Sequence, residues 1–393
     1  MIKAPPEGKV LVLLLVPAVM VMGNAALVPA LPSMRQDLGL SPGEAALVIT
    51  AFSGVAGLAL PLAGPMSDRL GRSRVLILAL IIFGVGAAVS ASAPLFGPMA
   101  WPVLLAGRGL QGLGAAGTQP VAWALAGDLY GGSRRESMLG YMESANGISK
   151  VASPVVGGLI STHSWPLLFI TFTAVSWAVA GLALATLPSR IRGAHPQVIP
   201  RVRDLLPMAP LVLGALPVFM ALFGLLAYLS EVLESRHLLT GAAKGLALSL
   251  PMMASALASL MVGLVMAPLG HPLVGTMLIF MALEASGFLI LAFLMGSPWA
   301  VLGLITVGLG NGGTLPPLNV LVTSSVPKAK RGAATAFYGT VRFTGVAAGP
   351  PLFMLAWARW GEIWALAGIG IMVAAGALMI LAASRSAGPA AAS

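Results

Sequence analysis

The fold of this chain is decided by the stretch Arg108-Gly-Leu-Gln-Gly-Leu-Gly-Ala-Ala-Gly-Thr-Gln-Pro120. Its core returns half a chain later, because Gly112-Leu113-Gly114 recurs as Gly308-Leu309-Gly310, and the glycine and proline that follow recur with it. The offset is 308 − 112 = 196 residues in a chain of 393 residues. The same offset carries Arg134-Arg135 onto Lys330-Arg331, so the register is kept beyond the glycines. The sequence therefore predicts two copies of one unit.

The composition places both copies in a membrane. Hydrophobic residues make up 58% of the chain and charged residues 9%, and the mean hydropathy is +0.95, whereas soluble domains carry about 25% charged residues. The net charge of +10 comes from basic residues in short loops between apolar runs. In that position they orient a membrane protein and do not indicate nucleic acid. The absence of cysteine excludes a disulfide framework, a thiolate zinc site and a thiol nucleophile.

Twelve apolar runs follow one another, each near the ~20 residues that a membrane-spanning helix needs. They lie at residues 10–32, 44–66, 74–93, 99–126, 136–160, 164–187, 208–231, 243–268, 273–294, 299–323, 333–357 and 363–383. We expect an all-α integral membrane protein with two pseudo-symmetric six-helix bundles, residues 1–188 and 208–393, joined by a polar linker at 189–207. Two copies in one register predict bundles related by an axis along the membrane normal, with a substrate path between them.

The distribution of basic residues predicts the orientation. One side of this topology holds fifteen Lys and Arg residues, including Lys3, Arg74 and Arg385, and the other side holds four: Arg35, Arg236, Lys244 and Arg359. The richer side is expected to be cytoplasmic, together with both termini and the linker. Most tryptophans fall near the expected outer helix ends, which agrees with this orientation.

A charged motif lies between the second and third runs. It reads Gly64-Pro-Met-Ser-Asp68-Arg69-Leu-Gly71-Arg72, in which glycines permit a tight turn and a carboxylate among arginines can form ion pairs. The plain alternative is an ordinary basic loop on the cytoplasmic side. The motif is more specific than that alternative requires, and we expect it to act as a conformational latch.

This loop, the Arg108–Pro120 stretch and the segment from Gly140 to Gly158 together resemble the major facilitator superfamily, in particular its twelve-helix drug:proton antiporter branch. The resemblance covers essentially the whole chain. It implies that Asp68 meets the cytoplasmic start of the eleventh helix near Gly332. Ser73 departs from the basic residue usual at its place, and the second copy has only Leu269-Gly-His-Pro272 in the equivalent loop. The resemblance therefore implies one latch.

Arg108 lies about a quarter of the way along the fourth run, and a guanidinium at the centre of a spanning helix costs roughly 2.5–3.5 kcal/mol or more. It must therefore find partners. The resemblance implies that an arginine at this place assists proton transfer, with Gln111 one turn away. The alternative is a structural arginine that is hydrogen-bonded to neighbouring helices.

The fifth run carries the residues that match the antiporter motif. These residues are Gly140, Ser149, Ser153, Pro154, Gly157 and Gly158, with serine at two places where the family has glycine. At ~100° per residue Gly140, Ser153, Pro154 and Gly157 share one arc of a helix with Glu143, Asn146, Gly147 and Lys150. That arc is expected to face the bundle. Glu143 and Lys150 stand seven residues, or ~10 Å, apart along the axis, too far for a direct pair.

Further polar residues are expected on the path. In the second copy Asn146 maps onto Arg342, and Tyr338 lies one turn before it. Asn24 and Glu231 are the remaining candidates for cavity contacts. Glu284, in the ninth run, is expected to be structural and to face away from the path, and Asp128 is expected to face Arg134 or Arg135. Glu143 with Arg108 is the expected proton-coupling pair, although a structural charge network would use the same residues.

Other functional classes are disfavoured. No phosphate-binding loop of a primary pump is present, and all four histidines fall in loops, so we expect neither ATP-driven transport nor an enzyme. We expect a monomeric secondary transporter in a bacterial cytoplasmic membrane that exports small neutral or anionic amphiphiles in exchange for protons, without cofactor, metal or nucleic acid. A dedicated exporter of an anionic metabolite such as a siderophore, and a lipid or glycolipid flippase, remain alternatives.

Overall fold

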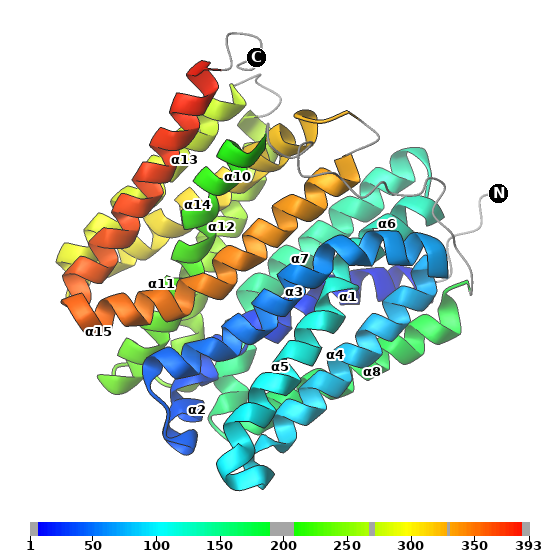
Figure 1. The fold of residues 1–393 in the computed structure, drawn as a ribbon, viewed down its shortest axis with the longest axis horizontal. Helices are drawn as coiled ribbons and strands as arrows, with labels where there is room; N and C mark the ends of the chain where they lie inside the picture. Colours follow the sequence, from blue (N-terminus) through cyan, green and yellow to red (C-terminus); the bar gives the residue numbers. More distant parts are fainter. Residues whose placement is uncertain (1–6, 189–207, 267–271, 328–330, 387–393) are drawn as a thin grey trace. The chain divides into compact units, whose positions relative to one another are not determined.

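The computed structural model describes residues 7–188, 208–266, 272–327 and 331–386, and every element in these ranges is a helix or a turn (Figure 1). The expected linker at 189–207 lies outside the described residues. The chain divides into two compact units, one from Met1–Ile199 with Leu233–Leu246 and the other from Pro200–Val232 with Ala247–Ser393. The short segment Leu233–Leu246 groups with the first unit, although its sequence belongs to the second copy.

The first unit is built from the following elements: α1 Glu7–Ala25, η1 Val28–Ala30, α2 Leu31–Leu38, α3 Pro42–Leu70, α4 Arg72–Ser92, η2 Ala93–Met99, α5 Ala100–Ala116, α6 Gln119–Leu129, α7 Gly132–Ser161 and α8 Trp165–Thr186. α3 begins with a capping box, in which Ser41 and Glu44 satisfy each other's backbone N–H groups. α4 packs against α3, α5 and α8, and α1 packs against α7 and α8.

The second unit is built from these elements: α10 Ala209–Gly214, α11 Leu216–Ser235, α12 Gly241–Met261, the π-helical turn η4 Val262–Met266, α13 Leu273–Leu294, α14 Ala300–Ser324 and α15 Arg331–Ser386. The end of α11 and the beginning of α12 belong to the segment that groups with the first unit. α13 packs against both α14 and α15.

The helices account for the twelve apolar runs. Nine helical segments within the described ranges are long and apolar enough to cross a membrane. Two of them contain a reversal, one at Gly97 (φ 51°) and one at Gly361 (φ 81°), where positive φ favours glycine. Counting each of these as two spans and adding α7 (30 residues) gives 9 + 2 + 1 = 12. The observed helices thus fit the expected architecture, six spans in each copy.

The glycines of the repeated stretch bring helix backbones into direct contact. A Cβ at Gly114 would lie 2.5 Å from the backbone nitrogen of Phe83 in α4, and a Cβ at Gly310 would collide with the backbone of Glu284 in α13. Small residues at such positions let spanning helices approach closely. The repeated glycines therefore form a pair of equivalent contacts, α4 with α5 in one unit and α13 with α14 in the other.

The two copies differ at the proline of the repeat. The run at 99–126 is broken into α5 and α6 around Gly117-Thr118, directly before Pro120, whereas α14 continues through Pro316 and Pro317. A proline inside a helix lacks the N–H donor and clashes with the carbonyl four residues earlier. The same residue type thus ends a helix in the first unit and is accommodated within one in the second.

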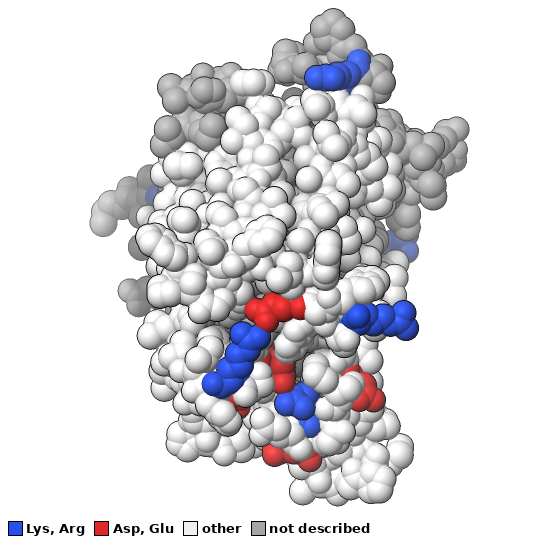
Figure 2. All heavy atoms as spheres, turned by 90° about the vertical axis from the view of Figure 1, so that its left-hand side faces the viewer, with Lys and Arg blue, Asp and Glu red and all other residues white. Residues whose placement is uncertain are grey.

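The surface agrees with a lipid environment. Large apolar side chains such as Leu58, Ile148, Phe293 and Leu378 are more than half exposed. Figure 2 shows one face on which Lys, Arg, Asp and Glu gather towards the lower end, while the middle of the face above them carries none. A broad apolar surface of this kind marks the part of a protein that lipid covers.

Candidate functional site

Arg108 is the centre of a buried polar cluster in the first unit. Its side chain is fully buried, and its guanidinium donates to Val48 O at 3.0 Å, to Gly23 O at 2.9 Å, to Gln111 Oε1 at 2.5 Å and to Asn24 Oδ1 at 3.3 Å. The guanidinium carbon lies 4.4 Å from the ring centroid of Phe52. Gln111, which was expected one turn from Arg108, and Asn24, which was expected as a cavity contact, are thus both hydrogen-bonded to Arg108.

The end of α1 explains one of these contacts. α1 ends at Ala25, and the amide of Leu27, which would serve Gly23 O in a continuing helix, bonds to Asn24 O instead. The carbonyl of Gly23 is therefore available to Arg108. All four acceptors of Arg108 are neutral oxygens, so its hydrogen bonds are satisfied while its positive charge is not balanced by a carboxylate within the described part of the chain.

The residues of the cytoplasmic motif form a chain of ion pairs. Arg72 Nη2 lies 3.3 Å from Asp68 Oδ1, and Arg72 Nε lies 2.6 Å from Asp128 Oδ2. Arg72 is buried, while Arg69 is exposed. Asp128 thus pairs with Arg72, a partner that was not expected, and it also interacts electrostatically with the expected Arg135, which lies over Gly127.

This motif is more helical than a loop. α3 runs through Gly64 to Leu70 and α4 begins at Arg72, which leaves Gly71 alone between the two helices, with φ 99°. A side chain at that φ would be strained, so glycine is required there. The tight turn holds Asp68 and Arg72 one helical turn apart and therefore within reach of each other.

α7 carries the antiporter-type motif and divides into a buried and an exposed part. Asn146, Ser153, Pro154, Gly157 and Gly158 are buried. The two serines that stand where the family has glycine donate back into their own helix, Ser149 Oγ to Ala145 O at 2.7 Å and Ser153 Oγ to Ser149 O at 2.5 Å. Such bonds satisfy a hydroxyl within a spanning helix. A Cβ at Gly157 would collide with Ala26 O, so this glycine sets the approach of α7 to the end of α1.

Towards the beginning of α7 the polar arc is exposed. Gly140 and Glu143 are exposed, and Glu143 Oε1 accepts a hydrogen bond from Asn146 Nδ2 at 3.1 Å. Lys150, two turns further on, is half-buried. The structure does not bring Glu143 to Arg108, since neither is a hydrogen-bond or ion-pair partner of the other.

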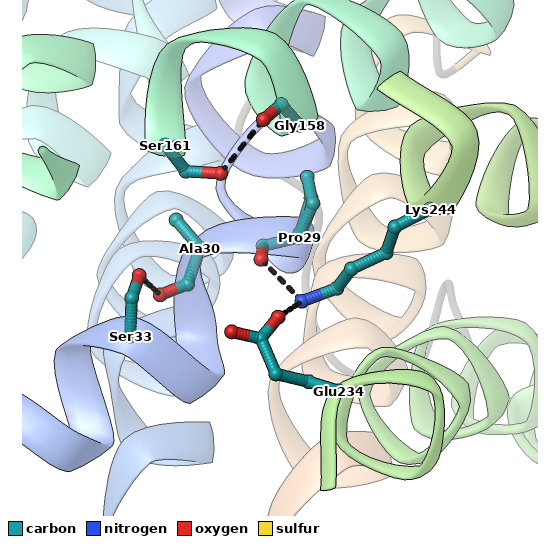
Figure 3. A network of polar contacts seen from close by, with 7 residues as sticks. All are labelled: Pro29, Ala30, Ser33, Gly158, Ser161, Glu234 and Lys244. Atoms are coloured by element: carbon teal, nitrogen blue, oxygen red, sulfur yellow. Dashed lines mark hydrogen bonds and ion pairs between the residues drawn. The ribbon is translucent and has the colours of Figure 1, made fainter. Parts of the chain in front are cut away.

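Lys244 forms a polar contact that sequence reasoning did not single out (Figure 3). It lies at the beginning of α12, is 1% exposed, and donates to Pro29 O at 2.7 Å and to the carboxylate of Glu234 at the end of α11. Gly158 and Gly245 make the neighbouring contacts of this segment, since a Cβ at either would collide with the facing backbone. A lone lysine within the apolar stretch Gly241-Ala-Ala-Lys-Gly-Leu-Ala-Leu248 was the available signal.

The candidates in the second unit are placed as follows. Tyr338 is buried on α15 with its ring centroid 5.9 Å from that of Phe219, and Arg342 on the same helix is half-buried. Glu231 is buried near the end of α11. Glu284, in α13, is fully buried, and its Oε1 accepts from Asn311 Nδ2 at 3.4 Å. Among the described residues, no group of three His, Cys, Asp or Glu side chains could hold a metal ion.

Nine helical segments of the described ranges that can cross a membrane, in a chain built from two copies of one unit and with charges buried inside its helices, are typical of a class: multi-pass membrane transport proteins. The family model of the Major Facilitator Superfamily matches residues 13–350, and the chain belongs to this family of transporters. The chain is 33% identical over 350 residues to the bacillibactin exporter of Bacillus subtilis, a match that covers 86% of this chain and 87% of that protein.

Two further comparisons agree with the family. The multidrug resistance protein MdtL of Klebsiella pneumoniae is 33% identical over 168 residues, 42% of each chain. The crystal structure of a bacterial homologue of the human lysosomal transporter Spinster, in an inward-facing and occupied conformation, superposes with a TM-score of 0.79 at 16% identity and covers 98% of each chain. The expected fold class and family are therefore confirmed.

Proposed function

We propose that this transporter exports an anionic or neutral amphiphile of the siderophore type in exchange for protons. The observation that carries the proposal is the 33% identity to the bacillibactin exporter over 86% of the chain, far more of the chain than the match to MdtL covers. Of the two expected cargo classes, drug-like molecules and siderophores, we therefore favour siderophores. Both classes would be exported by alternating access.

The charges of the described residues support this cargo. Arg108 is buried with neutral acceptors only, Arg342 is half-buried without an ion pair to a described carboxylate, and Lys150 is half-buried on the polar arc of α7. Against these three cations stand Glu143, Glu231 and Glu284. Guanidinium groups that are not paired with a carboxylate favour carboxylate, phenolate or other anionic groups of a ligand.

Three parts of the proposal follow from the sequence expectations. Glu143 and Arg108 take part in proton coupling, although they act at separate places on α7 and α5. Asp68, held by Arg72, meets the cytoplasmic start of the eleventh helix near Gly332 and latches one conformation. The protein works as a monomer in a bacterial cytoplasmic membrane with both termini inside, which a cysteine introduced at Ser133 tests, because labelling only from outside would contradict it.

The cargo is tested with purified protein in proteoliposomes and by thermal shift. The probes are bacillibactin, an anionic antibiotic, a cationic dye and a fluorescent phospholipid. Bacillibactin and the anionic antibiotic are expected to stabilise the protein and to be transported, and Lys150→Ala and Arg342→Ala are expected to weaken both. Arg359→Ala is the matched control, because it removes one exposed positive charge outside the proposed contacts. If only the dye binds and both variants leave binding unchanged, the proposal fails, and phospholipid movement would assign a flippase.

A further inference from the structure

A second buried polar cluster lies in the second unit, around Glu284 and Asn311. Glu284 in α13 is fully buried, and its Oε1 accepts a hydrogen bond from Asn311 Nδ2 of α14 at 3.4 Å. Asn311 Nδ2 also donates to Val218 O at 3.0 Å, and Asn311 Oδ1 accepts from Ser255 Oγ of α12 at 3.3 Å. Three helices and the backbone of a fourth thus meet at one amide. Glu284 Oε2 is buried and has no hydrogen-bond partner among the described residues.

The first unit shows that the fold does not need polar groups at this place. In the first unit Gly114 packs against Phe83, as Gly310 packs against Glu284 in the second unit. Asn311 corresponds to Ala115 by the repeat offset of 196 residues. Phe83 and Ala115 are both fully buried and apolar. The carboxyl and the amide that contacts it are therefore present in one copy and absent together from the other.

The reverse holds for the cluster of the first unit. Arg108 and Gln111 correspond by the same offset to Leu304 and Val307, both buried and apolar. Each copy thus contains a buried ionisable group that is hydrogen-bonded to an amide side chain, Arg108 in the first copy and Glu284 in the second. Ionisable groups inside spans are costly and are found where a transporter handles charge.

Among the residues that the structure describes, none forms an ion pair with Glu284. α13 and α14 hold no other titratable side chain. α15 packs beside Glu284 around Gly370, and its nearest titratable residues, Glu362 and Arg385, lie eight and fifteen residues from Gly370, roughly 12 and 22 Å along the helix. On α11 and α12 the titratable residues Tyr228, Glu231, Glu234 and Lys244 stand ten or more residues from Val218 or Ser255.

We propose that Glu284, held by Asn311 and Ser255, is a second proton-binding site of this transporter. The geometry fits a neutral carboxylic acid: Asn311 Nδ2 is directed at Oε1 as at a carbonyl oxygen, and Oε2 carries the proton. The proton passes from hydronium to Oε2, leaving water, and returns to water when the hydrogen bond of Asn311 to Val218 O of α11 opens during the transport cycle. This inference rests on the proposed proton exchange and adds a carboxyl in the second unit to Glu143 in the first.

The first test needs no substrate. Infrared difference spectra of the protein in nanodiscs are recorded over a pH series in H₂O and D₂O. The wild type is expected to show a carbonyl-stretch band of a protonated carboxyl that shifts in D₂O, Glu284→Gln is expected to lose that band, and Glu143→Gln is expected to keep it. Asn311→Ala keeps the carboxyl and is expected to shift the band, which leaves a readout if Glu284→Gln does not fold. A band that survives Glu284→Gln, or is unmoved by Asn311→Ala, overturns the proposal.

The second test separates coupling from transport. Proteoliposomes with bacillibactin on both sides report exchange without a pH gradient, and a pH jump reports proton-driven accumulation. Glu284→Gln is expected to keep exchange and to lose accumulation driven by the gradient. Accumulation at the wild-type level would overturn the coupling role. If the wild type moves no bacillibactin, the export proposal fails on its own, and the infrared result still decides the protonation of Glu284.

Discussion

Arg108→Leu, which places in the first unit the residue that the second unit has at the equivalent position, tests whether the buried arginine serves function or structure. Removing the guanidinium relieves a burial cost of roughly 2.5–3.5 kcal/mol at the centre of a span. It also leaves acceptors without donors, at about 1–3 kcal/mol for each buried one. Val48 lies inside α3 and keeps its helical hydrogen bond. Gln111 Nε2, which has no hydrogen-bond partner among the described residues, can donate to Asn24 Oδ1.

Two orphaned acceptors then remain, the carbonyl of Gly23 and one side-chain oxygen, and they cost about 2–6 kcal/mol together. Set against the relieved burial cost, the net change in stability lies within about 3 kcal/mol of zero. The folded protein should therefore persist, while transport is expected to fall by about 10²-fold or more if Arg108 assists proton transfer. Thermal unfolding in detergent and proton-driven transport in proteoliposomes measure the two quantities side by side.

The control for this prediction is Arg359→Leu, which removes an exposed arginine and should change neither quantity. Arg108→Lys keeps the positive charge but offers one nitrogen in place of the planar fork, so it cannot reach Gly23 O, Val48 O and Gln111 at once. Native transport by Arg108→Leu would refute a functional role. Failure of Arg108→Leu to fold would refute the balance of magnitudes and make the arginine structural.

Three further predictions concern the latch, the coupling and the packing. Asp68→Asn is expected to slow transport strongly and to leave ligand affinity nearly unchanged in a thermal-shift titration, since Asp68 pairs with Arg72 at the helix turn; a large loss of affinity with normal cycling would contradict this. Glu143→Gln is expected to abolish the response of efflux to a collapsed proton gradient, and a full response would move the coupling role to another carboxylate, Glu231 being next. Gly114→Ala is expected to destabilise the protein by about 1–3 kcal/mol through overpacking against Phe83. Gly140→Ala is the control, because a Cβ at Gly140 meets nothing within 4 Å, and it should leave the melting temperature unchanged or raise it. Equal effects of the two substitutions on the melting temperature would disprove the packing argument.

The sequence was sufficient for the architecture because its signals are local and periodic. Each apolar run has the length of a span, and the repeated glycines carry the register of the two copies across half the chain. The break before Pro120 was not predicted, because the equivalent Pro316 is accommodated within α14 and only the packing around each proline decides the outcome. Local pattern thus identifies spans better than it identifies their interruptions.

Partners across helices were harder to predict. Arg108 with Gln111 could be expected from their spacing on one helix, whereas the pairing of Asp128 with Arg72 joins two helices that the sequence does not place at a known distance. Lys244 and Glu234 come together with Pro29 O only through the grouping of Leu233–Leu246 with the first unit. A pattern along one helix shows which residues share a face, but not which side chain of another helix that face meets.

The glycine contacts also have a mechanical consequence. Where Gly114 meets the backbone of Phe83, and Gly310 that of Glu284, no side chain stands between the helices that could change rotamer and let them slide. Each pair, α4 with α5 and α13 with α14, therefore behaves as a stiff strut. In the first unit the strut ends at the break before Pro120, one turn beyond the contact, so bending concentrates at that joint. In the second unit α14 continues as an unjointed rod, and the two copies of one design thus differ in where they can flex.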